Sequence, residues 1–334
     1  MRELLYNFKK RKFSVRQARI PVAKRNLVVV KIAYSALCGT DLHVMRGIAR
    51  PKSYDSREII LGHAWTGSVA TIGRGVKNLR VGQKVYGSDY APCGRCLECK
   101  MGKENLCEHR FIPGIECPGT HREYALLPAN IIRPLPRGVG PEEGCLLADV
   151  LGVAYHAIHC ADFSKNSTIG IWGCGPIGLA AGLLLKKVYG VKKIFIAEPS
   201  AYRRRLAKRI FQPKIFHNRP SEFFVNFFDV AYEASGSNAA FHDAFHNIKR
   251  GGDLVILGIY DQPSLLSTFK LLTRHLRISG TFAYSFKDLD AVEKIAARTL
   301  DLSSLITHVF PLEKADVAYR LFRQKQTGAV LLKL

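Results

Sequence analysis

Short runs of apolar and β-branched residues, separated by glycine and proline, fill the chain from residue 1 to about residue 145. Runs of this kind, bounded by turn-forming residues, are typical of strands and not of helices. The runs that we interpret as strands are Leu27–Ala36, Trp65–Ile72, Val81–Tyr86 and Glu123–Leu127. This part of the sequence therefore predicts a compact β-rich domain.

The pattern changes from about Asp149 to Phe282, where strand-like runs alternate with helical ones. The predicted strands are Thr168–Trp172, Lys193–Ala197, Asp229–Ala234, Asp253–Leu257 and Leu276–Gly280. The predicted helices are Ile177–Val188, Ala201–Ile210 and Ala239–Ile248. Strict alternation predicts an α/β domain with a parallel sheet covered by helices. The tail, Asp288–Leu334, predicts one or two amphipathic helices and a final strand at Ala329–Leu334.

Length and composition fit two globular domains. The chain has 334 residues, of which 47% are hydrophobic, and this is enough for a substantial core. The start of the chain lacks the apolar segment of an export signal, so we expect a cytoplasmic protein with no membrane association. In that setting nine cysteines indicate metal binding and free thiols, not disulfides.

The formal net charge of +23 is high. Such a field attracts anions, which include nucleic acid, a phosphorylated substrate, a cofactor or an acidic partner. The basic residues are spread along the chain, with small clusters at Lys9–Lys12 and Arg203–Arg209. Because no aromatic-interleaved basic platform stands out, we favour a generally basic surface over nucleic-acid binding.

Four cysteines form a C-x2-C-x2-C-x7-C loop: Cys93, Cys96, Cys99 and Cys107. Four thiolates close a tetrahedral shell around zinc and leave no open position, which is typical of a structural site. An iron–sulfur cluster is the alternative, because ferredoxin motifs begin with the same spacing. Here the last spacing is seven residues and Glu108, not proline, follows Cys107. We therefore predict a structural zinc.

A second metal site is indicated by the six-residue run Cys38-Gly-Thr-Asp-Leu-His43. A catalytic zinc needs three protein ligands and one open position. Cys38 is the first candidate ligand, and His63, within Leu-Gly-His-Ala-Trp-Thr-Gly, is the second. Asp149 lies in an apolar run, where an unpaired charge is costly. Taken alone, His63 also fits a hydrogen-bonded core histidine, and Asp149 also fits a helix N-cap.

A G-x-G-x-x-G motif, Gly173-Cys-Gly175-Pro176-Ile177-Gly178, connects a predicted strand to a predicted helix. Its glycines allow a tight turn and let the backbone approach a pyrophosphate. Glu198 stands 20 residues after Gly178, where a carboxylate accepts hydrogen bonds from the adenosine ribose of NAD. Arg203–Arg205 follow and fit the 2′-phosphate of NADP instead, so NAD is favoured and NADP stays open.

Over essentially its full length the sequence resembles the zinc-dependent medium-chain alcohol and polyol dehydrogenases. The resemblance rests on the motifs above, on Glu233-Ala-Ser-Gly236, and on Leu305-Ile-Thr-His-Val-Phe-Pro-Leu312. It implies a GroES-like catalytic domain made of residues 1–148 and 285–334, with the structural zinc lobe at 93–107. It also implies a Rossmann dinucleotide-binding domain at residues 149–284.

The same resemblance implies roles for individual residues. Cys38, His63 and Asp149 would bind a catalytic zinc, which makes two zinc ions per chain. Thr40 and His43 would relay the alcohol proton, and Asp41 would orient the histidine ligand. Arg203 would stand beside the adenosine ribose, and the segment that includes Pro176 and Ile177 would bind the cofactor.

The function implied is hydride transfer between a small alcohol, such as a secondary alcohol or polyol, and NAD, in a homo-oligomer. The alternatives are an NADP-linked aldehyde or ketone reductase, and a basic zinc protein that has lost catalysis and binds nucleic acid or an acidic partner. Two departures from the family pattern stand out. Ala64 replaces the glutamate that usually follows the histidine ligand, and Cys117–His121 replaces a glycine-rich run.

Overall fold

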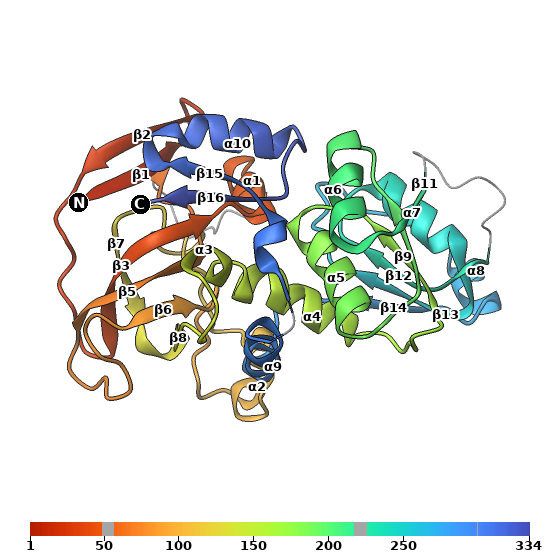
Figure 1. Ribbon diagram of the computed structural model, residues 1–334, viewed down its shortest axis with the longest axis horizontal. Coiled ribbons are helices and arrows are strands. Elements are labelled where there is room, and N and C mark those ends of the chain that lie inside the picture. The colour runs from red at the N-terminus through yellow and green to blue at the C-terminus, as the bar shows by residue number, and fades with distance from the viewer. Residues whose placement is uncertain (49–56, 217–225, 299) are drawn as a thin grey trace.

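The computed structural model describes residues 1–48, 57–216, 226–298 and 300–334. Two bodies lie side by side along the long axis of the molecule (Figure 1). One is built on a seven-stranded sheet and a three-stranded sheet, and the other on a six-stranded sheet. Both ends of the chain lie on the first body, so the chain leaves it, forms the second body and returns (Figure 1).

The seven-stranded sheet combines the two ends of the chain. Its strands are β3 (Leu27–Ala36), β5 (Ala64–Ile72), β6 (Lys84–Gly87), β7 (Tyr124–Pro128), β8 (Ile132–Pro134), β15 (Ile306–Pro311) and β16 (Ala329–Lys333). Strand β16 pairs antiparallel with β3, with Leu331 opposite Ala36. Val28, Val29 and Val30 of β3 are all almost fully buried, so this part of the strand is covered on both faces. The final strand therefore completes the sheet that carries Cys38.

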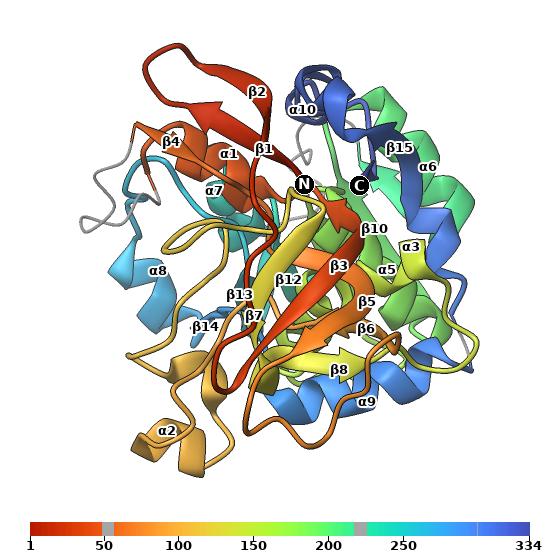
Figure 2. The ribbon, with the colours of Figure 1, turned by 90° about the vertical axis from the view of Figure 1, so that its left-hand side faces the viewer.

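A three-stranded sheet at the N-terminus covers one edge of this body (Figure 2). It contains β1 (Arg2–Asn7), β2 (Lys12–Gln17) and the short β4 (Glu58–Ile59). Leu4 and Tyr6 of β1 are buried in one apolar cluster with Tyr319 and Phe322 of helix α10 (Ala315–Arg323). The hairpin thus packs on the C-terminal helix.

The six-stranded sheet is parallel throughout, with strand order β11-β10-β9-β12-β13-β14. Its strands are β9 (Thr168–Trp172), β10 (Lys193–Ala197), β11 (Lys214–Phe216), β12 (Phe228–Glu233), β13 (Ile248–Ile256) and β14 (Arg277–Gly280). Helices α5 (Pro176–Lys187), α6 (Ala201–Phe211), α7 (Asn238–Asn247) and α8 (Thr268–Thr273) follow its strands. The order reverses beside β9, and this is where dinucleotides bind in such sheets.

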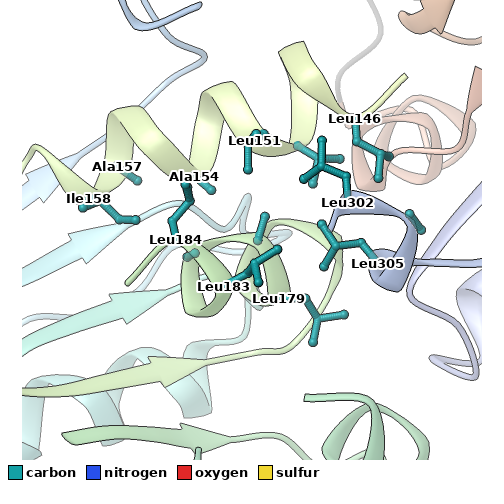
Figure 3. Packing of buried hydrophobic residues seen from close by; sticks show 14 of the residues in the cluster. Leu146, Leu151, Ala154, Ala157, Ile158, Leu179, Leu183, Leu184, Leu302 and Leu305 are labelled. Carbon is teal, nitrogen blue, oxygen red and sulfur yellow. The ribbon is translucent and has the colours of Figure 1, made fainter. Parts of the chain in front are cut away.

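A helical segment joins the two bodies. It runs through α3 (Pro141–Gly144), a π-helical turn (Leu147–Gly152) and α4 (Val153–Ile158), and α9 (Phe286–Ala296) packs beside it. Figure 3 shows Leu151 and Ala154 of this segment facing Leu183 of α5 and Leu305. These side chains are almost fully buried, so the cluster fixes the turn that carries Asp149 against the second body.

The predicted α/β fold class is confirmed, with a β-rich part and a parallel doubly wound sheet. None of the helices in the described part of the chain has the length and apolar character needed to cross a bilayer.

Candidate active site and metal centres

Cys38 lies where β3 ends and helix α1 (Gly39–Met45) begins. It is the N-cap of α1: its Sγ accepts a hydrogen bond from the Thr40 amide at 3.5 Å. The Asp41 carboxylate returns the interaction by accepting from the Cys38 amide at 3.0 Å. This reciprocal cap satisfies two amides that a helix start leaves free, and it fixes the thiol and the carboxylate relative to each other.

His63 and Asp149 come to Cys38 from two other elements. His63 directly precedes β5, and Asp149 lies within the π-helical turn. The three side chains are buried, and their ligand atoms all lie within 4.8 Å of one another. His63 Nε2 is 3.8 Å from Asp149 Oδ2. Asp149 lies in the first turn of this segment, but the N-cap is Leu146, so the alternative that Asp149 is an N-cap is wrong.

The charges around these three residues favour a cation. Burial raises the pKa of the Cys38 thiol well above its ordinary value, and the carboxylates of Asp149 and Asp41 add to this. Burial lowers the pKa of His63, but Asp149, Asp41 and Asp89 outweigh it and the net shift is upward. A bound divalent cation would offset this concentration of negative charge.

The donor set also fits zinc in its chemistry. One thiol, one imidazole and one carboxylate are ligands that zinc accepts, and three ligands leave a position open. Within the described residues His63 Nδ1 is buried without a hydrogen-bond partner, and Asp41 Oδ1 is 3.8 Å away. The side chain of His63 is therefore free to present Nε2 to a metal with Asp41 behind it.

Thr40 and His43 lie three residues apart on α1 and so share one face of that helix. Thr40 Oγ1 is 3.5 Å from Cys38 Sγ. His43 lines the cavity between the two bodies, and its Nδ1 is 3.0 Å from a nitrogen of Arg46 and 3.4 Å from Asp261 Oδ1. Burial and the nearby Arg46 lower the pKa of His43, so its imidazole is neutral near pH 7.

Sequence reasoning missed Asp89. This carboxylate is buried close to the metal-binding set, and burial together with Asp149 raises its pKa to about 6. The hydroxyl of Tyr284 donates a hydrogen bond to Asp89 Oδ1, and it also accepts one from the Asp89 amide at 3.1 Å. The only signal in the sequence was an acidic residue at the end of an apolar strand.

The four cysteines of the loop form the second group of ligand atoms within 4.8 Å of one another. The amides of Arg95 and Cys96 donate to Cys93 Sγ at 3.5 and 3.4 Å and lower the pKa of that thiol to about 6. The Cys93 amide donates to Cys107 Sγ at 3.3 Å, and the short helix α2 (Leu97–Lys100) carries Cys99. Amides directed at sulfur stabilise thiolates, so this loop is suited to a tetrathiolate metal.

The glycine motif forms the turn from β9 to α5. Gly173 has a φ of 95°, and a Cβ there would lie 2.8 Å from the Cβ of Ser235. A Cβ on Gly178 would lie 2.0 Å from the carbonyl oxygen of Gly173. Only glycine fits at these two positions, which leaves the N-terminus of the 12-residue helix α5 open to a phosphate.

Two cavities meet at this turn. One, of about 610 Å³, is lined by Cys38, Asp149, Pro176 and Ile177, and the other, of about 930 Å³, is lined by Glu198. Gly175 and Arg203 line both of them.

Glu198 and Arg203, which line the larger cavity, already make hydrogen bonds to the backbone. The Glu198 oxygens accept from the amides of Cys174 and Ser200 at 2.7 and 2.8 Å and have lone pairs left for a ribose. Arg203 is buried, and its Nε donates to the Thr327 carbonyl at 2.9 Å. Burial lowers the pKa of Arg203, although Glu198 and Cys174 act in the opposite direction.

Comparison with known proteins agrees with this geometry. Residues 24–137 match the model of the alcohol dehydrogenase GroES-like domain, and residues 176–298 match that of the zinc-binding dehydrogenases. The chain is 28% identical to an L-threonine 3-dehydrogenase from Proteus mirabilis over 322 residues, which are 94% of each chain.

Two solved structures cover all of this chain and 99% of their own. An alcohol dehydrogenase from Thermus sp. ATN1 is 25% identical with a TM-score of 0.90. An alcohol dehydrogenase from E. coli CFT073, in complex with NADH, is 25% identical with a TM-score of 0.87. The chain belongs to the zinc-dependent medium-chain alcohol dehydrogenase family. It is an oxidoreductase of the zinc-binding, NAD(P)-linked dehydrogenase type.

Proposed function

We propose that the protein oxidises a small secondary alcohol reversibly with NAD, at a zinc held by Cys38, His63 and Asp149. One observation carries this proposal: a single cavity is lined both by Cys38 and Asp149 and by Gly175 and Pro176 of the glycine turn. A metal bound by Cys38 and Asp149 and a dinucleotide bound at the glycine turn would therefore both border the same cavity. A structural zinc would occupy the four-cysteine loop and take no part in the reaction.

When bound, zinc would supply Lewis-acid activation of the alcohol and the nicotinamide would supply hydride exchange. The residues of the chain bind and orient these groups and the substrate, and they move the proton. The Thr40 hydroxyl, beside Cys38, would accept the proton of the substrate hydroxyl while it passes its own proton on. His43, on the same face of α1 and neutral near pH 7, takes it to the rim of the cavity.

NAD is favoured over NADP by the surroundings of Glu198. Its carboxylate lines the larger cavity and would repel a 2′-phosphate. Of the arginines that follow, Arg204 donates to the carbonyls of Glu198 and Pro199 at 2.7 and 2.8 Å, and Arg203, which lines the cavity, donates its Nε to the Thr327 carbonyl. An NADP-linked reductase is the second candidate, because Lys325 lines both cavities and could meet an additional phosphate.

We propose a substrate with a second polar group beside the carbinol. The support is the similarity to L-threonine 3-dehydrogenases and the polar lining of the smaller cavity, which includes His43, Ser235 and Asp261. L-threonine and short polyols are therefore the first compounds to test.

The proposed assembly is a homo-oligomer. Strand β14 is the last strand of the parallel sheet, and the adjoining loop and α8 expose large apolar side chains: Leu265, Phe269 and Leu272 are at least 74% exposed. Within the described residues the outer edge of β14 has no partner strand, and such an edge next to an apolar patch suits a two-fold contact with a second copy. Phe269→Asp should lower the mass measured by light scattering.

A cytoplasmic location is part of the same proposal, supported by nine free cysteines.

The decisive experiment combines metal analysis with an activity panel. We expect two zinc ions per chain and turnover of an alcohol or amino alcohol, with a higher kcat/KM for NAD than for NADP. One zinc per chain and no turnover of any compound with either cofactor would contradict the proposal. A higher kcat/KM for NADPH with aldehydes or ketones would select the reductase instead.

A further inference from the structure

A line of buried polar side chains runs behind the proposed metal site, on the side away from the cavity. Asp41 Oδ2 accepts a hydrogen bond from the hydroxyl of Tyr319 at 3.0 Å. The same hydroxyl lies 2.7 Å from His121 Nε2, and His121 Nδ1 lies 2.8 Å from Ser35 Oγ. Ser35 Oγ is in turn 2.8 Å from Thr120 Oγ1. All five residues are almost fully buried.

The hydrogens of this line can be assigned from the Asp41 carboxylate outward. A carboxylate accepts and does not donate, so Tyr319 gives its single hydrogen to Asp41. Tyr319 must then accept from His121 Nε2–H. Because burial lowers the pKa of His121 to about 4, its ring is neutral and Nδ1 must accept from Ser35. Ser35 then accepts the hydrogen of Thr120, and its Oγ also lies 3.3 Å from the Ala64 carbonyl oxygen.

The line reaches the metal ligands at two points. Asp41 holds the Cys38 amide through Oδ2, and its other oxygen faces His63 Nδ1 at 3.8 Å. His121 packs against Gly62, the residue before His63: a Cβ on Gly62 would lie 2.4 Å from His121 Nδ1. The amide of His121 also donates to the Leu61 carbonyl at 3.0 Å. The chain of hydrogen bonds therefore ends on the carboxylate that binds the Cys38 amide and lies 3.8 Å from His63 Nδ1.

We infer that Tyr319 and His121 are positioning residues for the proposed catalytic metal and act on it through Asp41. The inference rests on the proposed function, because it assumes a metal on Cys38, His63 and Asp149. Tyr319 donates to one carboxylate oxygen, which leaves the other 3.8 Å from His63 Nδ1. Without that hydroxyl the Asp41 side chain loses a buried donor and the orientation of His63 is no longer fixed.

The test measures how fast each zinc passes to a chelator in the folded protein. Tyr319→Phe removes one oxygen and keeps the ring, which stacks on Phe13 at 4.7 Å. Partners behind a metal ligand typically change metal affinity by about 10- to 100-fold. We expect Tyr319→Phe to speed the loss of one zinc about tenfold or more and to leave the four-cysteine zinc unchanged.

Tyr232→Phe is the matched control, because Tyr232 is also buried and its hydroxyl donates to the Ile158 carbonyl at 3.2 Å in the other body. Equal zinc release from the two variants, with two zinc ions in the unmodified protein, would overturn the inference and leave the proposed function standing. Only one zinc in the unmodified protein would overturn both.

Two further measurements separate positioning from general destabilisation. In an Asp41→Asn background Tyr319→Phe should add little to zinc release, because its effect passes through Asp41. A glutamine at position 121 can place a donor where Nε2 stands, but an asparagine cannot. His121→Gln should therefore retain zinc better than His121→Asn. Full additivity, or no difference between the two His121 variants, would count against the inference.

Discussion

The hydroxyl of Tyr284 and the carboxylate of Asp89 are hydrogen-bonded at the point where the chain returns from the parallel sheet. Tyr284 is fully buried, and its hydroxyl is also 2.9 Å from Ser88 Oγ. Its ring lies against Gly152, in the same turn as Asp149: a Cβ on Gly152 would be 2.9 Å from Tyr284 Cδ1. One tyrosine therefore connects the return segment (residues 281–286), Asp89 and the turn that holds a proposed metal ligand.

Tyr284→Phe should destabilise the fold more than an ordinary tyrosine substitution. It leaves the Asp89 amide and carboxylate without this buried partner, which costs about 1–3 kcal/mol, more for charged groups. Tyr232→Phe, which breaks a single hydrogen bond, should cost about 1 kcal/mol. Denaturant unfolding measures both values, and equal losses would contradict the role given to Tyr284.

Cys38→Ser should remove one zinc of two and lower kcat/KM at least about a hundredfold, because the catalytic site loses its thiolate ligand. The zinc of the four-cysteine loop should stay. Cys160→Ser is the control, since Cys160 Sγ bonds the His156 carbonyl at 3.4 Å and belongs to neither ligand group. Zinc content and turnover are measured together, and full activity in Cys38→Ser would exclude this metal assignment.

Glu198→Gln should narrow the preference for NAD over NADP by about tenfold or more, since it removes the negative charge that repels a 2′-phosphate. Asp243→Asn provides the comparison, because Asp243 lines the same cavity and its Oδ2 accepts from Trp172 Nε1 at 2.7 Å. The ratio of kcat/KM for the two cofactors is the measurement. A similar shift in both variants would mean that overall charge, not Glu198, sets the preference.

Loss of the structural zinc should loosen the return segment. The loop side chain Asn105 donates to the Phe282 carbonyl at 3.1 Å, and Glu104 accepts from the Phe286 amide at 3.2 Å. We expect Cys107→Ser to raise hydrogen exchange in residues 281–286, measured by mass spectrometry, while exchange in β9 stays unchanged. Unaltered exchange in the return segment after zinc loss would refute this link.

His121 should make stability depend on pH. Its pKa is about 4 in the folded protein, against 6.5 for an exposed histidine, because it is buried. Above pH 6.5 both states are neutral, and as pH falls toward 4 only the unfolded state takes up the proton. Between pH 7 and pH 5 the free energy of unfolding of the wild type should therefore fall by about 2 kcal/mol relative to that of His121→Asn. A constant difference in unfolding free energy across this range would contradict the prediction.

The sequence was sufficient where local pattern decides structure. The predicted strands Leu27–Ala36, Thr168–Trp172 and Lys193–Ala197 have the bounds that the structure shows, because buried apolar runs and glycine turns mark them. The N-terminal hairpin was missed, since β2 buries little and its apolar signal is weak. The helix α1 was missed as well, because it is short and begins at a cysteine.

Parts of the candidate site depend on contacts between distant residues. His121 and Tyr319 are 198 positions apart, and no local pattern relates them. Asp149 was ambiguous in the sequence because an acidic residue in an apolar run fits a cap or a ligand equally well. The π-helical turn, whose N-cap is Leu146, and the packing of α4 on α5 bring its carboxylate to 3.8 Å from His63 Nε2, so its role as a ligand stays a prediction.

The pairing of β16 with β3 has a consequence for the order of synthesis. A nascent chain on the ribosome has Cys38, His63 and Asp149 long before it has Ala329–Lys333, which complete the sheet beneath them. The parallel sheet, in contrast, needs only residues 168–280 and can form as it emerges. The nucleotide-binding part should thus fold first, and the metal-binding part should be finished only after release of the last strand.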